Sequence, residues 1–247
     1  MFSDAPPTII SAKSEVPVFV FCDHATNHIP YEFEKLGLSD KDLNRHIAWD
    51  IGAATLTRQI SNTFGAASLL AGFSRLLIDP NRDLNSPGLI PKISDALPIP
   101  GNQNLNQTQI NVRIEQFYKP YHQALEIEFD KLTARFFDPL IVSVHSFTPQ
   151  MASGEKRDLD IGLLWKVDKE KALRIKAEIE SIYPYQVGLN KPYSALKLNH
   201  TIDKHIIPRG LRHITFEVKQ DLIDTKAKVK KMANHLSKVL AHFIRSH

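Results

Sequence analysis

The stretch LIVSVHSFTP at residues 140–149 is an apolar run that ends at a histidine and is closed by Pro149. Its β-branched residues, Ile141, Val142 and Val144, are typical of a strand buried inside a sheet. In open α/β sheets, ligands bind just beyond the carboxyl ends of such strands. The pattern therefore places His145 where a fold of this kind carries its chemistry, although a hydrogen-bonded structural histidine fits the same pattern.

Strand-like apolar runs alternate with helical patterns along the rest of the chain. Further strands are predicted in the segments 16–24, 68–82 with a break near Gly72, 160–167, 185–194 and 211–223. Helices are predicted at about 40–64, at 169–182, in the C-terminal segment, and over a stretch whose apolar face carries Ile114, Tyr118, Tyr121, Leu125 and Phe129. This alternation predicts an α/β fold with a mixed, largely parallel sheet flanked by helices on both faces. We expect residues 1–247 to form a single domain, in which the long loop 83–110 is functional or mobile.

The composition is that of an ordinary globular protein. Hydrophobic residues make up 43% of the 247 residues and charged residues 23%, and the net charge is +4. The C-terminal lysines lie opposite the apolar face of the last predicted helix, so we expect a solvated helix face rather than a nucleic-acid-binding surface. The single cysteine, Cys22, excludes an internal disulfide. With no signal-peptide pattern and no apolar run of the roughly 18 residues that span a membrane, we expect a cytoplasmic protein that binds neither membranes nor nucleic acid.

Polar side chains follow the predicted strands at four places. These four groups are Asp23, His24, Asn27 and His28, then Asp79, Asn81 and Arg82, then His145 and Ser146, and finally Glu217. A shared functional site requires that these strand ends lie together in the fold, as the carboxyl ends of parallel strands do.

His24 and His145 are candidate ligands of a metal ion. Imidazole suits Zn²⁺, and a catalytic zinc ion keeps three protein ligands and an open position for water. The third ligand is expected near one of the histidines, with Asn27, His28 and Asp50 as candidates. The alternative is that both histidines are structural and have satisfied hydrogen bonds.

Two charged residues suggest chemistry beside such a metal ion. Glu217 lies within the apolar run HITFEVKQD (213–221), where an isolated carboxylate is costly. A carboxylate beside metal-bound water can take a proton from it and pass the proton to a leaving amine, whereas an ion pair with Arg212 or Lys219 is the alternative. Arg82 has a planar guanidinium that fits a carboxylate in bidentate fashion, with Asn81 adding an amide donor, and a turn with a capping arginine is the alternative.

Several of these stretches resemble those of known metallohydrolases. VSVHSF (142–147), IDPNRD (78–83) and ITFEVKQD (214–221) resemble a histidine-ligand strand, an Asn-Arg pair and a catalytic-glutamate strand of zinc carboxypeptidases, in the same chain order. A closer resemblance covers nearly the whole chain. CDHATNHIP (22–30), HIAWDIGA (46–53), SRLLIDPNRD (74–83), DIGLLW (160–165), NKPYS (190–194) and RGLRHITFEVKQDLI (209–223) resemble the N-formylglutamate amidohydrolase family.

The resemblance implies a zinc-carboxypeptidase-like fold and a metal-dependent amidohydrolase. The implied reaction removes an N-formyl or other N-acyl group from an acidic amino acid such as N-formyl-L-glutamate, a step of histidine degradation. One Zn²⁺ ion would be held by His24 and His145 with Asp50 or Asn27, since Asn27 stands where the carboxypeptidase pattern has a glutamate.

The other residue roles complete this mechanism, with Arg75 placed on the segment before the Asn-Arg pair and Tyr193 and His200 on the loop before the Glu217 strand. Glu217 would transfer the proton, Arg75 would stabilise the developing oxyanion, Asn81 and Arg82 would hold the substrate carboxylate, and Tyr193 and His200 would line the substrate pocket. A surface arginine and a structural histidine are the alternatives for Arg75 and His200. A metallo-carboxypeptidase, another N-acyl-amino-acid deacylase, and a metal-free binding protein on the same scaffold are the rival functions.

Overall fold

The fold is built on one seven-stranded sheet, seen in a computed structural model that describes residues 5–152, 154, 156–167, 169–197 and 199–245. The strand order is β1-β3-β2-β6-β9-β7-β8. The strands are β1 Thr8–Ile10, β2 Val18–Cys22, β3 Ala67–Leu70, β6 Leu140–Phe147, β7 Ile161–Leu164, β8 Val187–Leu189 and β9 Arg212–Lys219. A separate small hairpin pairs β4 Ile93–Ser94 with β5 Leu97–Pro98.

Four neighbouring strands, β3, β2, β6 and β9, run parallel to one another. β1 is antiparallel to β3 at one edge, and β7 is antiparallel to β9 and parallel to β8 at the other. Every residue of β2 and β6 is buried, which explains why their sequences are continuous apolar runs rather than alternating ones. The predicted mixed, largely parallel sheet is confirmed.

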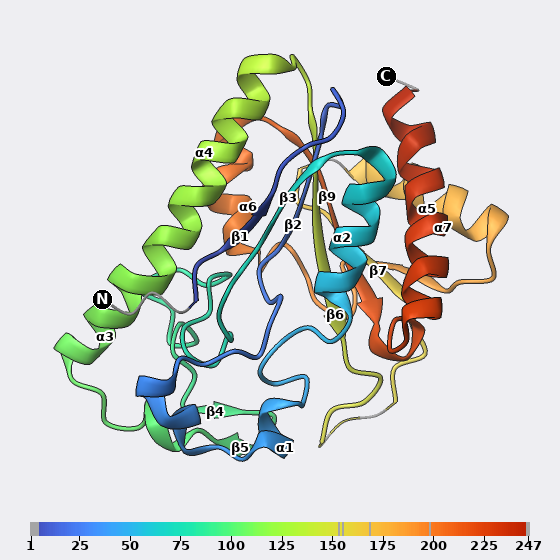
Figure 1. Ribbon diagram of the computed structural model, residues 1–247. Helices are drawn as coiled ribbons and strands as arrows, with labels where there is room; N and C mark the ends of the chain where they lie inside the picture. Colours follow the sequence, from blue (N-terminus) through green and yellow to red (C-terminus); the bar gives the residue numbers. More distant parts are fainter. Residues whose placement is uncertain (1–4, 153, 155, 168, 198, 246–247) are drawn as a thin grey trace.

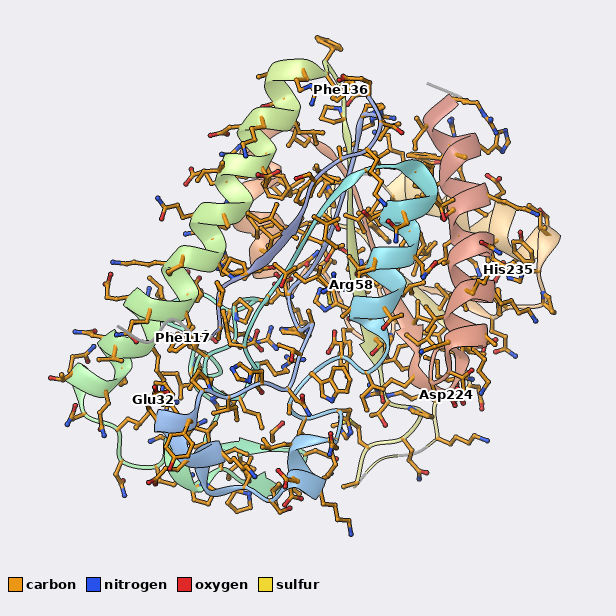
Figure 2. All side chains as sticks on the ribbon, in the orientation of Figure 1. Glu32, Arg58, Phe117, Phe136, Asp224 and His235 are labelled. Carbon is orange, nitrogen blue, oxygen red and sulfur yellow. The ribbon has the colours of Figure 1, made fainter. Side chains whose placement is uncertain are left out.

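Helices cover both faces of this sheet (Figure 1). α2, α5 and α7 pack on one face, and α4 and α6 pack on the other. Alternate residues of β2 supply the two interfaces, because Val18 and Val20 face the first group of helices and Phe19 and Phe21 face the second. Figure 2 shows side chains filling both spaces, with Phe117 on the α4 side and His235 on the α7 side. The helices are α1 Asp40–Leu43, α2 Ala53–Phe64, α3 Gln107–Arg113, α4 Lys119–Arg135, α5 Lys169–Ile182, α6 His200–His205 and α7 Lys226–Arg245.

The prediction of one helix at about 40–64 is wrong for the middle of that range, which is not helical. The chain forms α1 and α2, and the residues between them turn through the neighbourhood of β2, where the Asp50 N–H donates to the His24 carbonyl at 2.9 Å. Gly52 then starts α2 with a φ of +84°. A Cβ at Gly52 would lie 2.5 Å from the Ile223 carbonyl oxygen, so both the backbone angle and the close approach require glycine.

The strand predicted at 68–82 is correct only over β3. After Gly72 the backbone leaves the sheet and bonds to the segment that follows β2. The Ser74 N–H donates to His28 O at 2.7 Å, and the Arg75 N–H donates to Ala48 O at 3.2 Å. This excursion carries residues 74–82 across the carboxyl end of the sheet. Within the described ranges, no helix is both long enough and apolar enough to cross a membrane.

Candidate functional site

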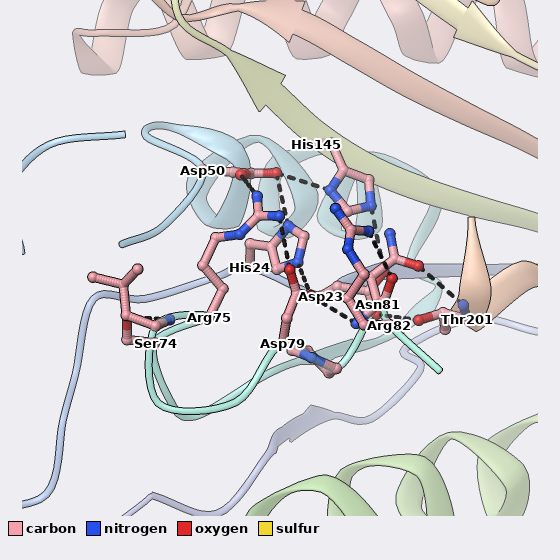
Figure 3. Close-up of polar contacts among 12 residues, drawn as sticks. Asp23, His24, Asp50, Ser74, Arg75, Asp79, Asn81, Arg82, His145 and Thr201 are labelled. Atoms are coloured by element: carbon pink, nitrogen blue, oxygen red, sulfur yellow. Dashed lines mark hydrogen bonds and ion pairs between the residues drawn. The ribbon is translucent and has the colours of Figure 1, made fainter. Parts of the chain in front are cut away.

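The polar residues that follow the predicted strands lie together at the carboxyl end of the sheet (Figure 3). His24 follows β2, His145 lies near the end of β6, and Glu217 lies near the end of β9. Because these strands are parallel, their carboxyl ends lie at the same end of the sheet. His145 and Glu217 are paired in register, so their side chains lie on the same face of the sheet, the one that α4 and α6 cover.

Three buried side chains, His24, Asp50 and His145, bring potential ligand atoms within 4.8 Å of one another. The Asp50 Oδ2 atom lies 2.8 Å from Nδ1 of His145 and 3.4 Å from Nδ1 of His24. Tetrahedral zinc, with bonds of ~2.0–2.1 Å, places its ligand atoms about 3.3 Å apart. Two imidazoles and one carboxylate are also donors that zinc accepts. The residues therefore fit a zinc ion in both spacing and donor type.

Each imidazole also faces a second buried carboxylate with its other ring nitrogen. Nε2 of His24 lies 2.8 Å from Oδ1 of Asp79, and Nε2 of His145 lies 3.3 Å from Oδ2 of Asp23. Histidine ligands of metals usually donate their other ring N–H to such a group, which fixes the orientation of the ring. The arrangement leaves both Nδ1 atoms facing Asp50.

Arg75 connects two of the carboxylates. Its Nη2 atom is 2.8 Å from Oδ2 of Asp79, and its Nη1 atom is 3.5 Å from Oδ1 of Asp50. It is thus part of the site and not an ordinary surface arginine. Metal ligation requires neutral imidazoles, and in that state the three buried carboxylates of Asp23, Asp50 and Asp79 exceed this one guanidinium in charge by the two units that a divalent cation supplies.

Opposite charges shift the pKa values of these groups. Burial would raise the pKa of Asp50, yet the facing His24 and His145 hold it below its usual range. Burial alone would lower the pKa of His145, but its contacts with Asp23 and Asp50 raise it well above the usual value. Burial also opposes ionisation of Asp79, and the Arg75 guanidinium more than offsets this, so its pKa is well below normal. The carboxylates are therefore ionised at neutral pH, as metal ligation and its support require.

Glu217 is a buried carboxylate without a hydrogen-bond partner for Oε2 among the described residues. The alternative ion pairs do not form, because Arg212 Nε is 2.7 Å from Asp138 Oδ2 and Lys219 Nζ is 2.8 Å from Asp160 Oδ1. Burial raises the pKa of Glu217 to about 7, although His145 acts in the opposite direction. A carboxylate in this state can both accept and release a proton near neutral pH.

The triad and Glu217 line a cavity of about 310 Å³. Arg75, Asn81, Arg82 and Tyr193 also line it. Its volume is at the lower end of the range of small-molecule sites. The cavity also has an apolar wall, formed by Ile47, Leu76, Phe147 and Met151.

Arg82 and Asn81 present donors to this cavity. The Arg82 Nη1 group donates to its neighbour's carbonyl, Asn81 O, at 2.9 Å, and no carboxylate of the described residues forms an ion pair with Arg82. The Asn81 Oδ1 atom accepts the Thr201 N–H at 3.0 Å, which leaves its Nδ2 donors for a ligand. The pair is therefore suited to bind a carboxylate.

Three candidates from the sequence do not reach the cavity. The Asn27 Nδ2 group donates to Leu43 O at 2.9 Å and to Asn44 Oδ1 at 3.1 Å. His200, at the start of α6, lies 2.7 Å from the Tyr118 hydroxyl through Nε2. Neither residue lines the cavity, nor does His28. Asp50, rather than Asn27 or His28, completes the triad.

Sequence reasoning missed the supporting roles of Asp23 and Asp79, although both stand directly at the polar strand ends. It also missed the rim of the cavity, where Asp95 of the β4–β5 turn contacts Arg45 Nη2 at 3.1 Å and His46 Nε2 at 3.4 Å. Asp95 Oδ1 further accepts the Ala152 N–H at 3.0 Å. No local pattern indicates these contacts, because they join segments about 50 residues apart or more.

Comparisons with known proteins agree with this geometry. A model of the N-formylglutamate amidohydrolase family matches residues 16–224, which include the triad and Glu217. The chain is similar to the crystal structure of a gene product from Agrobacterium tumefaciens, with 31% identity and a TM-score of 0.91 over 98% of this chain and 95% of that one. It is also similar in fold to an N-formylglutamate amidohydrolase from Ralstonia eutropha JMP134, with 20% identity and a TM-score of 0.76 over 98% and 99% of the two chains. No curated protein sequence matches it.

Proposed function

Since the chain belongs to the N-formylglutamate amidohydrolase family, and is thus a hydrolase that acts on an amide bond, we propose that it uses zinc to remove an N-formyl or other small N-acyl group from an acidic amino acid. N-formyl-L-glutamate is the proposed type of substrate. The observation that supports this most is the meeting of His24, Asp50 and His145 with the unpartnered Glu217 in one cavity.

In this proposal His24, Asp50 and His145 would hold the zinc ion, each through one ligand atom. When bound, zinc supplies Lewis-acid polarisation of the acyl carbonyl and lowers the pKa of a water molecule towards ~7. Asp23 and Asp79 keep the two imidazole rings in place.

Glu217 carries the proton in this reaction. As the oxygen of water bonds to the acyl carbon, Oε2 of Glu217 accepts one of the water protons. The C–N bond then breaks, and Glu217 delivers the proton to the departing amino nitrogen. The products are the carboxylic acid, formic acid for a formyl group, and the free amino acid, so that all atoms of substrate and water are accounted for.

Arg82 and Asn81 bind the substrate carboxylate and so fix the amide against the base. Arg75 lies beside Asp50 and Asp79 in the cavity wall, and its positive charge would stabilise the negative charge that develops on the carbonyl oxygen. Tyr193 contributes a hydroxyl to the cavity wall, and this hydroxyl accepts from Arg157 Nη1 at 3.3 Å.

A substrate panel with metal control tests the proposal. The purified protein is assayed on N-formyl-L-glutamate, N-acetyl-L-glutamate, N-formyl-L-leucine and a dipeptide, before and after chelation and after Zn²⁺ is returned. We expect turnover of an N-acyl acidic amino acid that chelation abolishes and Zn²⁺ restores. Activity that is indifferent to chelation would contradict the metal role, and preferential cleavage of the dipeptide would favour a carboxypeptidase.

The carboxylate clamp has its own test with a matched control. Arg82→Ala is expected to raise KM for N-formyl-L-glutamate by about 10- to 100-fold, because a charge-assisted bidentate contact of ~1.5–3 kcal/mol is lost. Arg58→Ala is the control, since Arg58 is an exposed arginine of α2 (Figure 2) and does not line the cavity. Equal KM values for the two variants would remove Arg82 from substrate binding.

A further inference from the structure

We propose that four side chains outside the cavity are positioning residues for the substrate-binding loop 79–82: Tyr118, directly before α4, His122 of α4, and His200 and His205 of α6. The inference rests on the proposed function in so far as this loop carries Arg82 and Asn81. It goes beyond that function because it assigns control of substrate affinity to residues that do not line the cavity.

Three consecutive residues of the loop are each held from the α4–α6 side. The Pro80 carbonyl lies 3.0 Å from Nε2 of His122, and the Arg82 carbonyl accepts the Tyr118 hydroxyl at 2.9 Å. Between them, the Asn81 side chain accepts the Thr201 N–H at the start of α6. The backbone of the loop is therefore bonded to the α4 side before and after Asn81, and the Asn81 side chain is bonded to α6.

The pair His122 and His205 has only one consistent arrangement of protons when both rings are neutral. A carbonyl oxygen accepts but never donates, so Nε2 of His122 must carry the proton that bonds to Pro80 O. Burial lowers the pKa of His122 to about 3 and that of His205 to about 4, so both rings are neutral at pH 7. Nδ1 of His122 is then an acceptor, and Nε2 of His205, 2.8 Å away, is its donor.

The pair Tyr118 and His200 follows the same rule. The phenol has one proton, and the Arg82 carbonyl can use only that proton, so the hydroxyl donates to Arg82 O. Nε2 of His200, 2.7 Å from the phenol oxygen, must therefore donate to it. In each pair, the α6 histidine donates to Tyr118 or His122, which in turn donates to a carbonyl of the loop.

These bonds matter because of what the loop carries. Arg82 and Asn81 face the cavity, and Asp79 orients the His24 imidazole. Tyr118 and His122 are buried and belong to a continuous helical segment, so they form a rigid support. A displacement of about 1 Å in a substrate-positioning group can cost up to ~100-fold in rate or affinity.

The first experiment compares Tyr118→Phe with Tyr185→Phe. Both substitutions remove a hydroxyl bonded to a histidine, but Tyr185 bonds to Nδ1 of His235, on the face of the sheet opposite α4. We expect Tyr118→Phe to raise KM for N-formyl-L-glutamate by about 5- to 10-fold with kcat within twofold, in line with one lost hydrogen bond. Tyr185→Phe should change neither constant. An unchanged KM in Tyr118→Phe, or a fall in kcat alone, would overturn the proposal.

A rescue experiment separates positioning from general packing. His200→Gln keeps an N–H donor for the phenol oxygen, whereas His200→Leu does not. The glutamine variant should stay within twofold of the wild-type KM, and the leucine variant should shift towards Tyr118→Phe. Equal KM values for the two variants would contradict the assigned donor role.

Amide hydrogen exchange supplies a readout that does not need turnover. The Asn81 N–H donates to Asp79 Oδ1 at 2.9 Å and the Arg82 N–H donates to Asp79 O at 3.2 Å, so their protection reports opening of the loop. Tyr118→Phe should speed exchange of both amides about 5- to 10-fold, and Tyr185→Phe should leave them unchanged. If the wild type hydrolyses none of the substrates, the proposed function fails, yet these exchange rates still decide the positioning role. Unchanged exchange in Tyr118→Phe would refute that role whatever the activity.

Discussion

Asp50 is the residue on which the proposed metal site depends most. One carboxylate oxygen faces the Nδ1 atoms of His24 and His145, and the other lies 3.5 Å from Arg75. Glu217 stands apart from these contacts, since Oε2 bonds to no described residue. The site therefore contains one carboxylate that is fully engaged and one that is free to exchange protons.

Glu217→Gln should keep the metal and lose turnover. The amide has nearly the shape of the carboxylate but cannot accept a proton from water, so kcat should fall by about 10²- to 10⁴-fold. Bound zinc is measured on the same samples and should stay at one ion per chain. Glu128→Gln is the control, because Glu128 is a largely buried glutamate of α4 that pairs with Lys131. Wild-type kcat in Glu217→Gln would show that another base acts.

Asp23→Asn should weaken zinc binding without removing a ligand. Asp23 accepts the Tyr121 and Thr201 hydroxyls through Oδ1 and faces His145 through Oδ2. Loss of such a supporting carboxylate typically lowers metal affinity by about 10- to 100-fold. Competition with a chromogenic chelator measures the Kd, and Asp203→Asn, on the α6 surface pair with Lys166, should leave it unchanged. A wild-type Kd in Asp23→Asn would show that His145 needs no such support.

At the level of the elements, the loop after β8 crosses unusually close to β7. Gly162 of β7 pairs in register with Glu217, and a Cβ at Gly162 would collide with the Lys191 carbonyl oxygen and lie 3.1 Å from the Glu217 Cβ. The same loop carries Tyr193 into the cavity. Because Gly162 has no side chain, the loop after β8 can pass close to β7, and this path places Tyr193 in the same cavity as Glu217.

Gly162→Ala should damage the site more than Gly188→Ala in the neighbouring strand. The Cβ at position 162 would meet the Lys191 backbone, whereas the nearest atom at position 188, at 2.8 Å, is the end of the Leu159 side chain, which can move. We expect Gly162→Ala to lower the free energy of unfolding by about 1–3 kcal/mol and kcat by at least tenfold. Gly188→Ala should lower the free energy of unfolding, measured by urea denaturation, by less than half as much, and should keep kcat within threefold of the wild-type value. Similar losses in both variants would refute the role assigned to the crossing loop.

The sequence predicts the elements whose pattern is local, and fails where a distant contact decides. His24, His145 and Glu217 each follow or interrupt an apolar run, so their place at the strand ends could be predicted. The turn at Asp50 could not, because it depends on Gly52 lying against Ile223 and on an N–H bond to His24. The choice of Asp50 over Asn27 has the same origin, since it brings together residues 26 and 95 positions apart in the chain.

At the scale of the whole molecule, the two helical layers differ in character. The α2–α5–α7 layer is an apolar core, whereas the α4–α6 layer also contains the buried polar residues that reach the site. Between α4 and α6, His122 and His205 are stacked with their rings 5.0 Å apart. The charged or titratable groups that act on them are Asp23, His200, Lys204 and Arg209.

This buried pair predicts a loss of stability in mild acid. The folded pKa values of about 3 and 4 lie below the ordinary value of 6.5, so the unfolded chain takes up protons first as the pH falls. The stabilising contribution is complete above pH 6.5 and declines towards pH 4, by up to ~1.4 kcal/mol per pH unit for each histidine. The free energy of unfolding is measured by urea denaturation at pH 6.5, 5.5 and 4.5. It should fall less steeply in His205→Asn than in the wild type, by about 1 kcal/mol per pH unit. Parallel declines would contradict this assignment.

The hydrogen bonds of Asp23 join positions 98 and 178 residues apart, to Tyr121 and Thr201 respectively. Closing such long loops is entropically slow, so a nascent chain cannot assemble this centre from its first hundred residues. If the triad binds zinc as proposed, metal uptake would report the final docking step during refolding. In a stopped-flow experiment, tight metal uptake should appear no earlier than the protection of α6 amides.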